Sequence, residues 1–205
     1  MFILRILKSL IYRASCLFET IIDKVCFIRV KLVFMYWGIK HSSFKTKGIP
    51  YLLVGGEIII GKDFSMNNNI CGNPIGFSEP CLFACYSGAK ISIGDHVGIS
   101  STALVAMADI IIENYVKIGG GGKIYTTDFH SLQPDWRKSN QDKVHRIIAP
   151  VTIKENAFIG AGVIILKGVT IGRNAIVGAG SVVTKSIPDN EIWAGNPAHF
   201  IKKIG

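Results

Sequence analysis

The sequence of 205 residues predicts an all-β solenoid, in which short strands and tight turns repeat every six residues. Three observations support this fold class. β-branched residues recur every six positions from residue 153 to residue 183, small residues recur four positions after them, and glycine stands beside the first column. A long helix would show a spacing of 3.6 and a free strand would alternate, so a period of six fits neither. A short strand followed by a turn fits it, with the branched residue pointing inward each time.

The two columns contain one polar member. The branched column consists of Ile153, Ile159, Ile165, Ile171, Val177 and Val183. The second column consists of Ala157, Val163, Val169, Ala175 and the polar Ser181. The glycines beside the first column lie where a corner needs a positive φ or a close backbone approach, at Gly160, Gly172 and Gly178.

The first 50 residues differ in charge from the rest of the chain. They hold nine Lys or Arg residues against Glu19 and Asp23, a net charge of +7 out of +9 in the whole sequence. In residues 1–37 polar residues recur near helical spacing among Leu, Ile, Phe and Val, which predicts a basic amphipathic helical segment. No run of 18 uncharged apolar residues occurs there, so we expect neither a transmembrane helix nor, with charges interrupting any apolar core, a secretory signal.

Two interpretations of residues 1–37 remain open. In one, a pair of helices packs on the solenoid or on neighbouring subunits. In the other, the segment makes a peripheral membrane contact, with its cations on anionic headgroups and its apolar side chains in the lipid, namely Phe2, Ile3, Leu7 and Leu10. The basic charge belongs to this segment and not to the solenoid, and we expect no nucleic-acid partner.

The five cysteines predict a reduced, cytosolic compartment, because their number is odd and their spacing is irregular. Cys81 and Cys85 stand four residues apart, but no second Cys/His pair completes a metal site at a suitable spacing. We interpret the cysteines as packing residues and expect no metal.

The remaining elements follow in chain order. Residues 38–50 are polar and basic and read as a connector, so the predicted units are 1–50 and 51–205, with the period visible from about Ile58. Residues 67–82 lose the period and are rich in Asn, Gly and Pro, which predicts a turn or protruding loop. The column then resumes, and slips by one residue at a corner, through Ile93, Ile99, Val105, Ile112, Ile118 and Ile124.

A second interruption, at 125–148, separates two regular parts of the repeat. The segment carries no column of six, yet Ile153 restarts the period directly after it. An insertion that leaves a rigid repeat and returns to it is a surface loop, and such loops tend to carry function. This one contains His130 and His145.

The repeats, the stretch TTDFHS at 126–131 and the ending WAGNPAHFIKKI at 193–204 resemble the hexapeptide-repeat acyltransferases, in particular the galactoside, maltose and polysaccharide O-acetyltransferases. The resemblance extends from about Ile58 to Gly205. It implies a left-handed parallel β-helix with three strands per coil, a homotrimer, and acetyl-CoA as donor to a sugar or glycan acceptor.

His130 is the catalytic candidate that this resemblance implies. Acetyl transfer to an alcohol needs a base with a pKa near neutrality, and histidine is the side chain that has one. In the family the loop histidine takes the hydroxyl proton while the acceptor attacks acetyl-CoA directly. Asp128 is predicted either to orient His130 or to bind the acceptor. His145 lacks the family context, and we assign it to the surface.

The resemblance also implies residues for the donor and the acceptor. The donor residues, matched position by position to the family pattern, are Phe158, Ala161, Ala179, Thr184, Lys185 and Lys202. For the acceptor, related enzymes place an asparagine about one coil before the histidine. This chain reads ISSTAL there, so Ser101 or Thr102 would supply the polar contact.

The sequence thus predicts an acetyl-CoA-dependent O-acetyltransferase of bacterial surface polysaccharide biosynthesis, cytoplasmic or peripheral on the inner face of the cell membrane. Two alternatives stay open: an N-acetyltransferase acting on an amino sugar, and a non-catalytic scaffold subunit. A γ-type carbonic anhydrase would need three zinc-binding histidines, two of them five residues apart, and Asp135 stands five residues after His130.

Overall fold

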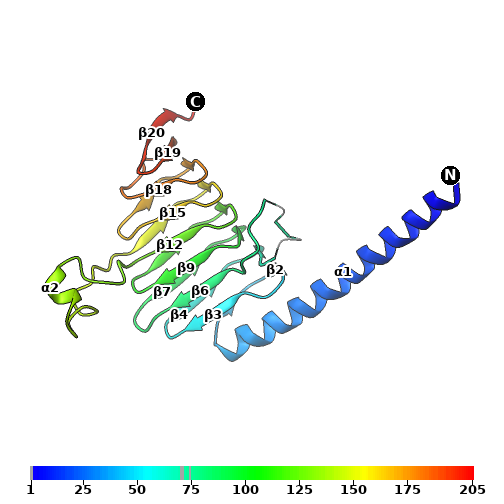
Figure 1. The fold of residues 1–205 in the computed structure, drawn as a ribbon, viewed down its shortest axis with the longest axis horizontal. Helices are drawn as coiled ribbons and strands as arrows, with labels where there is room; N and C mark the ends of the chain where they lie inside the picture. Colours follow the sequence, from blue (N-terminus) through cyan, green and yellow to red (C-terminus); the bar gives the residue numbers. More distant parts are fainter. Residues whose placement is uncertain (1, 70–71, 74) are drawn as a thin grey trace.

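A computed structural model describes residues 2–69, 72–73 and 75–205, and the side chains of these ranges from Leu17 onward. Three parallel walls of strands surround one interior, and the chain visits them in turn (Figure 1). Sheet A contains β1 (Lys40–His41), β4 (Glu57–Ile60), β7 (Lys90–Ile93), β10 (Ile110–Ile112), β13 (Val151–Ile153) and β16 (Thr170–Ile171). Sheet C contains β3 (Tyr51–Val54), β6 (Leu82–Cys85), β9 (Ala103–Ala106), β12 (Lys123–Tyr125), β15 (Ile164–Ile165) and β18 (Val182–Val183).

Sheet B lies between these two along the chain and ends in an antiparallel hairpin. The hairpin is formed by its last two strands, whereas the other neighbours in all three sheets pair in parallel. Its strands are β2 (Phe44–Lys47), β5 (Phe64–Asn67), β8 (Gly98–Ser100), β11 (Lys117–Ile118), β14 (Phe158–Ile159), β17 (Ile176–Val177), β19 (Glu191–Gly195) and β20 (Ala198–Lys203).

The predicted columns fill the interior of this left-handed parallel β-helix. All six branched residues from Ile153 to Val183 are at most 1% exposed, and so are the small residues of the second column from Ala157 to Ser181. Every sixth residue points inward because each wall contributes one short strand and each corner a few residues. The predicted fold class is therefore confirmed.

Each coil has three corners, which we name AB, BC and CA after the sheets that they join. At the BC corner successive turns stack so closely that a Cβ on Gly160 would lie 2.5 Å from the backbone nitrogen of Ala179. At the AB corner a ladder of asparagine side chains links three coils: the Nδ2 of Asn156 donates to Oδ1 of Asn174, and that of Asn174 to Oδ1 of Asn190. These stacked corners give a rigid frame.

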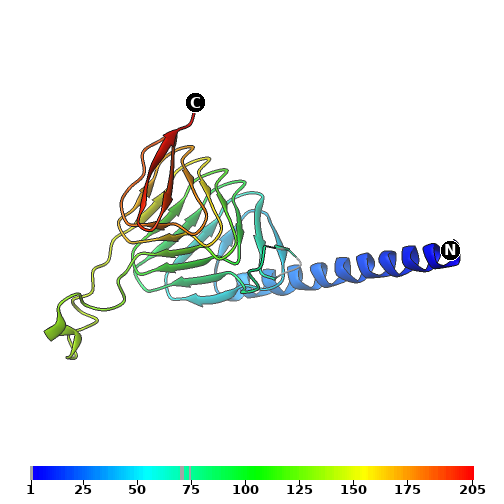
Figure 2. The same ribbon diagram turned by 45° about the horizontal axis from the view of Figure 1, so that its top comes forward.

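Two insertions leave the frame at different corners. Residues 68–81 connect β5 to β6 at a BC corner, which agrees with the predicted loop at 67–82. Residues 126–150 connect β12 to β13 at a CA corner and carry the short helix α2 (Pro134–Arg137), and they project from the side of the solenoid (Figures 1 and 2).

The N-terminal segment is one continuous helix, α1 (Phe2–Tyr36), and not the pair of helices in one of our interpretations. The reason is that residues 1–37 contain neither Gly nor Pro to break it. The helix packs on the first coil through Val30 and Phe34, both fully buried, and the ring of Phe34 lies 5.1 Å from that of Phe44. Beyond this contact it projects away, crosswise to the stack of coils (Figure 2).

The solenoid begins earlier than the period in the sequence indicates. Strands β1 and β2 lie within the predicted connector at 38–50 and pair in parallel with β4 and β5. In β2 the side chains of Phe44 and Thr46 point inward and alternate with two exposed or half-exposed lysines, so the strand alternates but lacks an aliphatic column residue. No helix in the described residues is long and apolar enough to cross a bilayer.

Candidate active site

The neck of the loop at 126–150 is held by a buried threonine. The hydroxyl of Thr126 accepts hydrogen bonds from the backbone nitrogens of Met107 (2.8 Å) and Ala108 (3.0 Å). The two sides of the neck are joined by an antiparallel bridge between Thr127 and Ile148. The loop is therefore anchored to the corner of the preceding coil where it leaves the frame.

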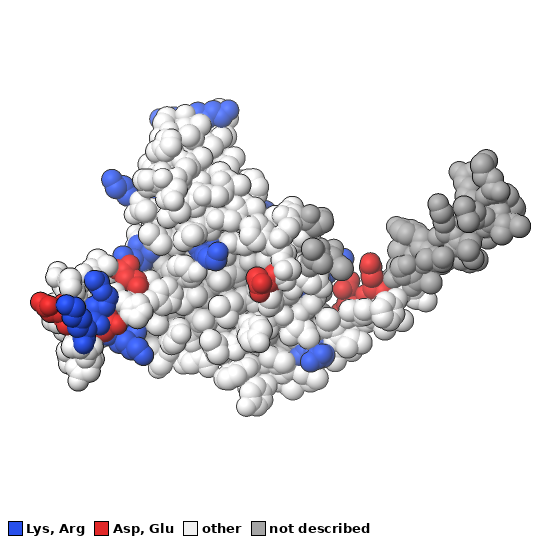
Figure 3. All heavy atoms as spheres, in the orientation of Figure 1, with Lys and Arg blue, Asp and Glu red and all other residues white. Residues whose placement is uncertain are grey.

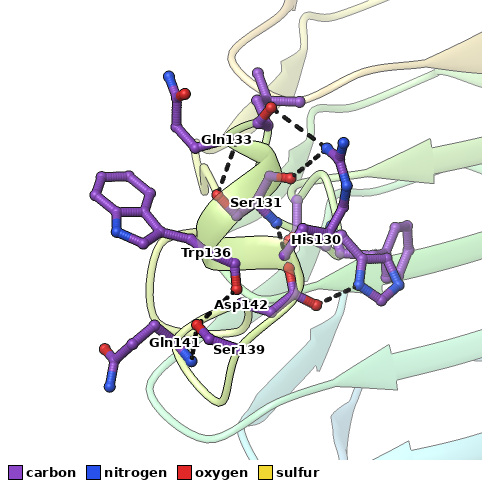
Figure 4. A network of polar contacts seen from close by, with 11 residues as sticks. His130, Ser131, Gln133, Trp136, Ser139, Gln141 and Asp142 are labelled. Atoms are coloured by element: carbon purple, nitrogen blue, oxygen red, sulfur yellow. Dashed lines mark hydrogen bonds and ion pairs between the residues drawn. The ribbon is translucent and has the colours of Figure 1, made fainter.

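The imidazole of His130 and the carboxylate of Asp142 are in contact within this loop (Figure 4). The Nδ1 atom of His130 lies 2.6 Å from Oδ2 of Asp142, whose Oδ1 accepts a hydrogen bond from the backbone nitrogen of Ser131 at 2.8 Å. The side chain of Asp142 is 16% exposed and that of His130 is 65% exposed. The hydrogen bond from His130, followed by that from Ser131, lowers the pKa of Asp142. A carboxylate on Nδ1 leaves Nε2 as the ring nitrogen that can accept a proton.

Asp128 does not orient His130 through its side chain, because that carboxylate pairs with a cation on the next coil. Its Oδ1 lies 2.6 Å from Nζ of Lys167, and both side chains are about 20% exposed. Its Oδ2 is buried and has no hydrogen-bond partner. Only the backbone links the two predicted residues, since the nitrogen of His130 donates to the carbonyl of Asp128 at 2.7 Å. The role in acceptor binding stays a prediction.

The backbone next to the histidine is in an uncommon conformation. Phe129 has a φ of +64°, which bulky residues rarely adopt. Its nitrogen donates to the hydroxyl of Thr127 at 3.0 Å, and its ring meets that of Tyr125 edge-on at 5.4 Å. These contacts hold the turn that presents His130. Conformations of this kind concentrate at functional sites.

The outer part of the loop is organised around α2. The guanidinium of Arg137 donates to the carbonyl of Ser131 at 2.9 Å, so the helix is tied back to the residue after the histidine. His145 stacks on Trp136 with ring centroids 3.7 Å apart, at the surface. The second histidine of the loop thus supports its outer part.

The predicted donor residues divide between two corners of the chain. Phe158 is half exposed on the outer face of sheet B, Ala161 and Ala179 lie at successive BC corners, and the exposed Lys202 lies on β20 beside Ile192. Thr184 and Lys185 are exposed at the CA corner, two coils beyond the loop, about 10 Å at the usual strand spacing. Within one chain the prediction is therefore not a single cluster.

The predicted acceptor residues also lie away from His130. Ser101 and Thr102 occupy a BC corner and are buried, and strand β9 separates them from the CA corner by about 13 Å. The hydroxyl of Thr102 donates to the carbonyl of Ser100 at 2.9 Å, and a nearby cavity of about 420 Å³ is lined by Ser101 and Phe77 among others. Residues one coil apart lie close together only if they are at the same corner. Ser101 and Thr102 do not share a corner with His130.

Asp142 and Lys167 are the two site residues that the sequence did not indicate. Asp142 lies twelve residues after its partner on an irregular loop, where no spacing rule applies. Lys167 sits at the CA corner of the next coil, and counting corners from Ile165 would have placed it beside the loop. Among the described residues, no group of three or more His, Cys, Asp or Glu side chains could hold a metal ion.

Comparison with known proteins supports the fold and the repeat. Residues 150–185 match the family model described as bacterial transferase hexapeptide (six repeats). A galactoside O-acetyltransferase of Lactococcus lactis subsp. lactis (strain IL1403) is 37% identical over 129 residues, which are 62% of this chain and 60% of the relative. The chain thus spans about 60% of the length of the curated relatives it matches.

Two solved structures extend the similarity to most of the chain. A maltose O-acetyltransferase from Clostridium difficile 630 is 31% identical with a TM-score of 0.55, and the match covers 75% of this chain and 70% of the other. A mutant of AntD, an N-acyltransferase from Bacillus cereus solved with dTDP and coenzyme A, is 26% identical with a TM-score of 0.64, and the match covers 80% and 83%. The chain belongs to the hexapeptide-repeat acyltransferase family.

Proposed function

We propose that this protein is an acetyl-CoA-dependent O-acetyltransferase that acetylates a sugar hydroxyl, in the biosynthesis of a bacterial surface polysaccharide. The observation that carries the proposal is the His130–Asp142 pair on a loop that leaves the solenoid at a CA corner. Similarity to galactoside and maltose O-acetyltransferases supports the choice of a sugar hydroxyl.

The pair supplies an oriented general base. Asp142 accepts the Nδ1–H of His130, so that Nε2 carries the lone pair. Nε2 takes the proton of the acceptor hydroxyl while its oxygen attacks the carbonyl carbon of the thioester. The C–S bond then breaks, and the imidazolium returns the proton to the departing sulfur. Asp142 stabilises the charge that His130 carries between these two transfers.

The surface beside the loop fits a donor that combines phosphates with a narrow amide arm. Lys185 is an exposed cation at the CA corner two coils beyond the loop, and compact cations suit phosphate. At the BC corner Ala179 is exposed and Gly180 has no atom within 4 Å of the place of a Cβ, so the backbone there is open to a ligand. Acetyl-CoA supplies the acetyl group as a thioester.

A homotrimer would bring the two corners together, and we propose one. Residues predicted for one site lie on two corners of one chain, which is what a site shared between neighbouring subunits requires. The wall over β9, β12, β15 and β18 is also largely free of charged side chains (Figure 3). Sheet C as a whole carries exposed or half-exposed uncharged residues at Leu53, Leu82, Ala103, Ile164 and Val182, with Lys123 as an exception. Such a wall suits burial against another subunit.

Acetylation of an amino sugar is the second candidate. The AntD structure contains dTDP and coenzyme A and belongs to an N-acyltransferase, which favours an amine acceptor carried by a nucleotide. The same base and the same thioester would serve both reactions. We place the enzyme in the cytoplasm, where it would work at the inner face of the membrane.

A donor-consumption assay tests the proposal. Release of coenzyme A thiol from acetyl-CoA is followed against a panel of neutral sugars, amino sugars and their nucleotides, with wild-type protein and with Asp142→Asn. We expect turnover with a neutral sugar, linked to an ester in the product, and a large loss in the variant. An amide product would select the second candidate. Absence of acetyl-CoA binding by calorimetry would refute acetyl transfer altogether.

A further inference from the structure

Helix α1 presents an unbroken apolar face to solvent. Its residues alternate at spacings of three and four, and each is at least half exposed, namely Phe18, Ile21, Val25, Ile28, Leu32 and Met35. We call this set the outer face of α1. Soluble proteins rarely leave a contiguous apolar surface of this kind without a partner. The cause of its exposure lies in how the helix sits on the solenoid.

The opposite side of the helix is the one that packs. Val30 and Phe34 are fully buried against the first coil, and the ring centroid of Phe27 lies 4.9 Å from that of Phe44 in a tilted pair. At 100° per residue, Val30 and Phe34 point roughly opposite to Ile21 and Ile28. The solenoid therefore uses one side of α1 and leaves the outer face exposed, with Ile28, Leu32 and Met35 also bordering grooves between the helix and the first coils.

The charges on the described part of the helix are sorted by side. Lys24 and Lys31 follow one border of the outer face and Arg29 follows the other. The acidic residues, Glu19 and Asp23, lie on the side turned toward the solenoid. An apolar face with cations on both borders and acids behind it is complementary to a lipid surface that carries negative headgroups.

We propose that the outer face of α1 is a docking surface for an anionic bilayer and that the helix lies in the plane of that bilayer. This sharpens the proposed peripheral location, rests on it alone, and does not depend on acetyl transfer. The apolar residues that the sequence predicts in the lipid, from Phe2 to Leu10, lie outside the described side chains. The outer face extends the proposed membrane contact to Met35.

A second copy of this chain is the other occupant that the spacing fits, since a three–four alternation also forms coiled coils. In a parallel pair of α1 helices, however, Lys24 of one copy would face Arg29 of the other. Like charges at these flanking positions oppose pairing, whereas anionic headgroups neutralise both. The charge pattern thus favours lipid over a copy of the helix.

The docking surface also fixes where the active-site loop stands. The helix packs on the first coil, and the loop leaves the fourth coil, about 14 Å further along the stack at the usual strand spacing. An enzyme resting on α1 would hold His130 above the headgroups and within reach of a glycan attached to a lipid.

Vesicle sedimentation with the full chain tests the proposal. The vesicles contain phosphatidylcholine with or without phosphatidylglycerol. Wild-type protein should sediment with the anionic vesicles and release as salt rises. Ile21→Gln with Ile28→Gln should lower the partition coefficient more than about tenfold. Lys24→Gln with Arg29→Gln should lower it about 25-fold, at about fivefold per charge.

Matched controls separate the face from a general loss of apolar surface or charge. Phe200→Gln with Ile201→Gln removes two half-exposed apolar residues at the other end of the solenoid, and Lys62→Gln with Lys203→Gln removes two exposed cations. Both should bind vesicles as wild type does. Thermal unfolding and thiol release should be unchanged in the outer-face variants, which separates this proposal from acetyl transfer. Wild-type protein that ignores anionic vesicles, or outer-face variants that change only the oligomeric state, would overturn it.

Discussion

The imidazole of His130 and the carboxylate of Asp142 are joined at 2.6 Å across twelve residues of an irregular loop. The same carboxylate also accepts a hydrogen bond from the backbone nitrogen of Ser131. One acidic side chain therefore fixes both the ring of His130 and the backbone of the turn that carries this ring. The removal of His130 and the removal of Asp142 should therefore have different consequences.

Substitution of His130 by alanine removes the proposed base. We expect kcat to fall about 10²–10⁴-fold, with acetyl-CoA affinity nearly unchanged, because a positioned base has this effect on the chemical step. Steady-state kinetics and calorimetry measure the two quantities. His145→Ala is the control, and it should keep wild-type turnover, since His145 stacks on Trp136 at the surface of the loop. Near wild-type kcat in the first variant would remove His130 from the mechanism.

Acid should loosen the turn at His130 by protonating Asp142. Hydrogen bonds from His130 and Ser131 lower the pKa of Asp142, so its carboxylate stabilises the loop above the usual carboxyl value of about 3.9. That contribution is lost as pH falls through the lowered value in the folded protein. The amide of Ser131 should then lose protection against hydrogen exchange, measured by NMR between about pH 5 and pH 2.

Two references calibrate this measurement. The amide of Ala149 donates to the carbonyl of Thr126 at 3.0 Å in the neck and should stay protected over the same range. In Asp142→Asn the protection of Ser131 should be lower and should not respond to pH. A pH response of Ser131 that survives this substitution would have to come from another group.

The spacing of the BC corners should make Gly160 intolerant of a side chain. A Cβ there would lie 2.5 Å from the nitrogen of Ala179 and 2.8 Å from the carbonyl oxygen of Val177, both of them backbone. Gly160→Ala should therefore lower the free energy of unfolding by about 1–3 kcal/mol, as overpacking does. At Gly98 the same atom would meet the flexible ends of Ser65 and Lys117, so Gly98→Ala should cost clearly less in chemical denaturation. Equal losses of the free energy of unfolding in the two variants would mean that the spacing between coils does not determine the cost of the added side chain.

The sequence predicted the frame because the frame is periodic. A residue such as Ile165 or Val177 is buried by its place in the count of six, and no contact needs to be known in advance. The first coil was missed because the inward residues of β2 are Phe44 and the polar Thr46, so that the column has no aliphatic residue in this strand. The continuous helix could have been predicted, since the first glycine of the chain is Gly38.

The site was only partly predictable for the same reason. His130 was identified by its resemblance to family loops, but its partner Asp142 lies on a loop whose path follows from packing around α2 and not from spacing. Asp128 is nearer to His130 in the sequence, but its carboxylate pairs with Lys167 of the next coil. Sequence distance along a loop therefore says little about which carboxylate meets the ring.

The BC corner should be needed for donor binding. Ala179→Leu places a bulky side chain at an exposed corner, where it should obstruct the donor arm without disturbing the interior. We expect weaker acetyl-CoA binding by calorimetry and an unchanged oligomer mass by light scattering. Unaltered acetyl-CoA affinity with the oligomer intact would place the donor elsewhere.

Mixed oligomers can then test whether the CA corner of one subunit works with the BC corner of its neighbour. His130→Ala and Ala179→Leu subunits are each expected to be nearly inactive alone. If the site is shared, a mixture unfolded and refolded together contains interfaces in which an intact His130 meets an intact Ala179 corner. Random assembly around a threefold axis makes these about one quarter of all interfaces, so about a quarter of wild-type turnover should return. If both corners act within one chain, every chain lacks one of them and the mixture should stay inactive.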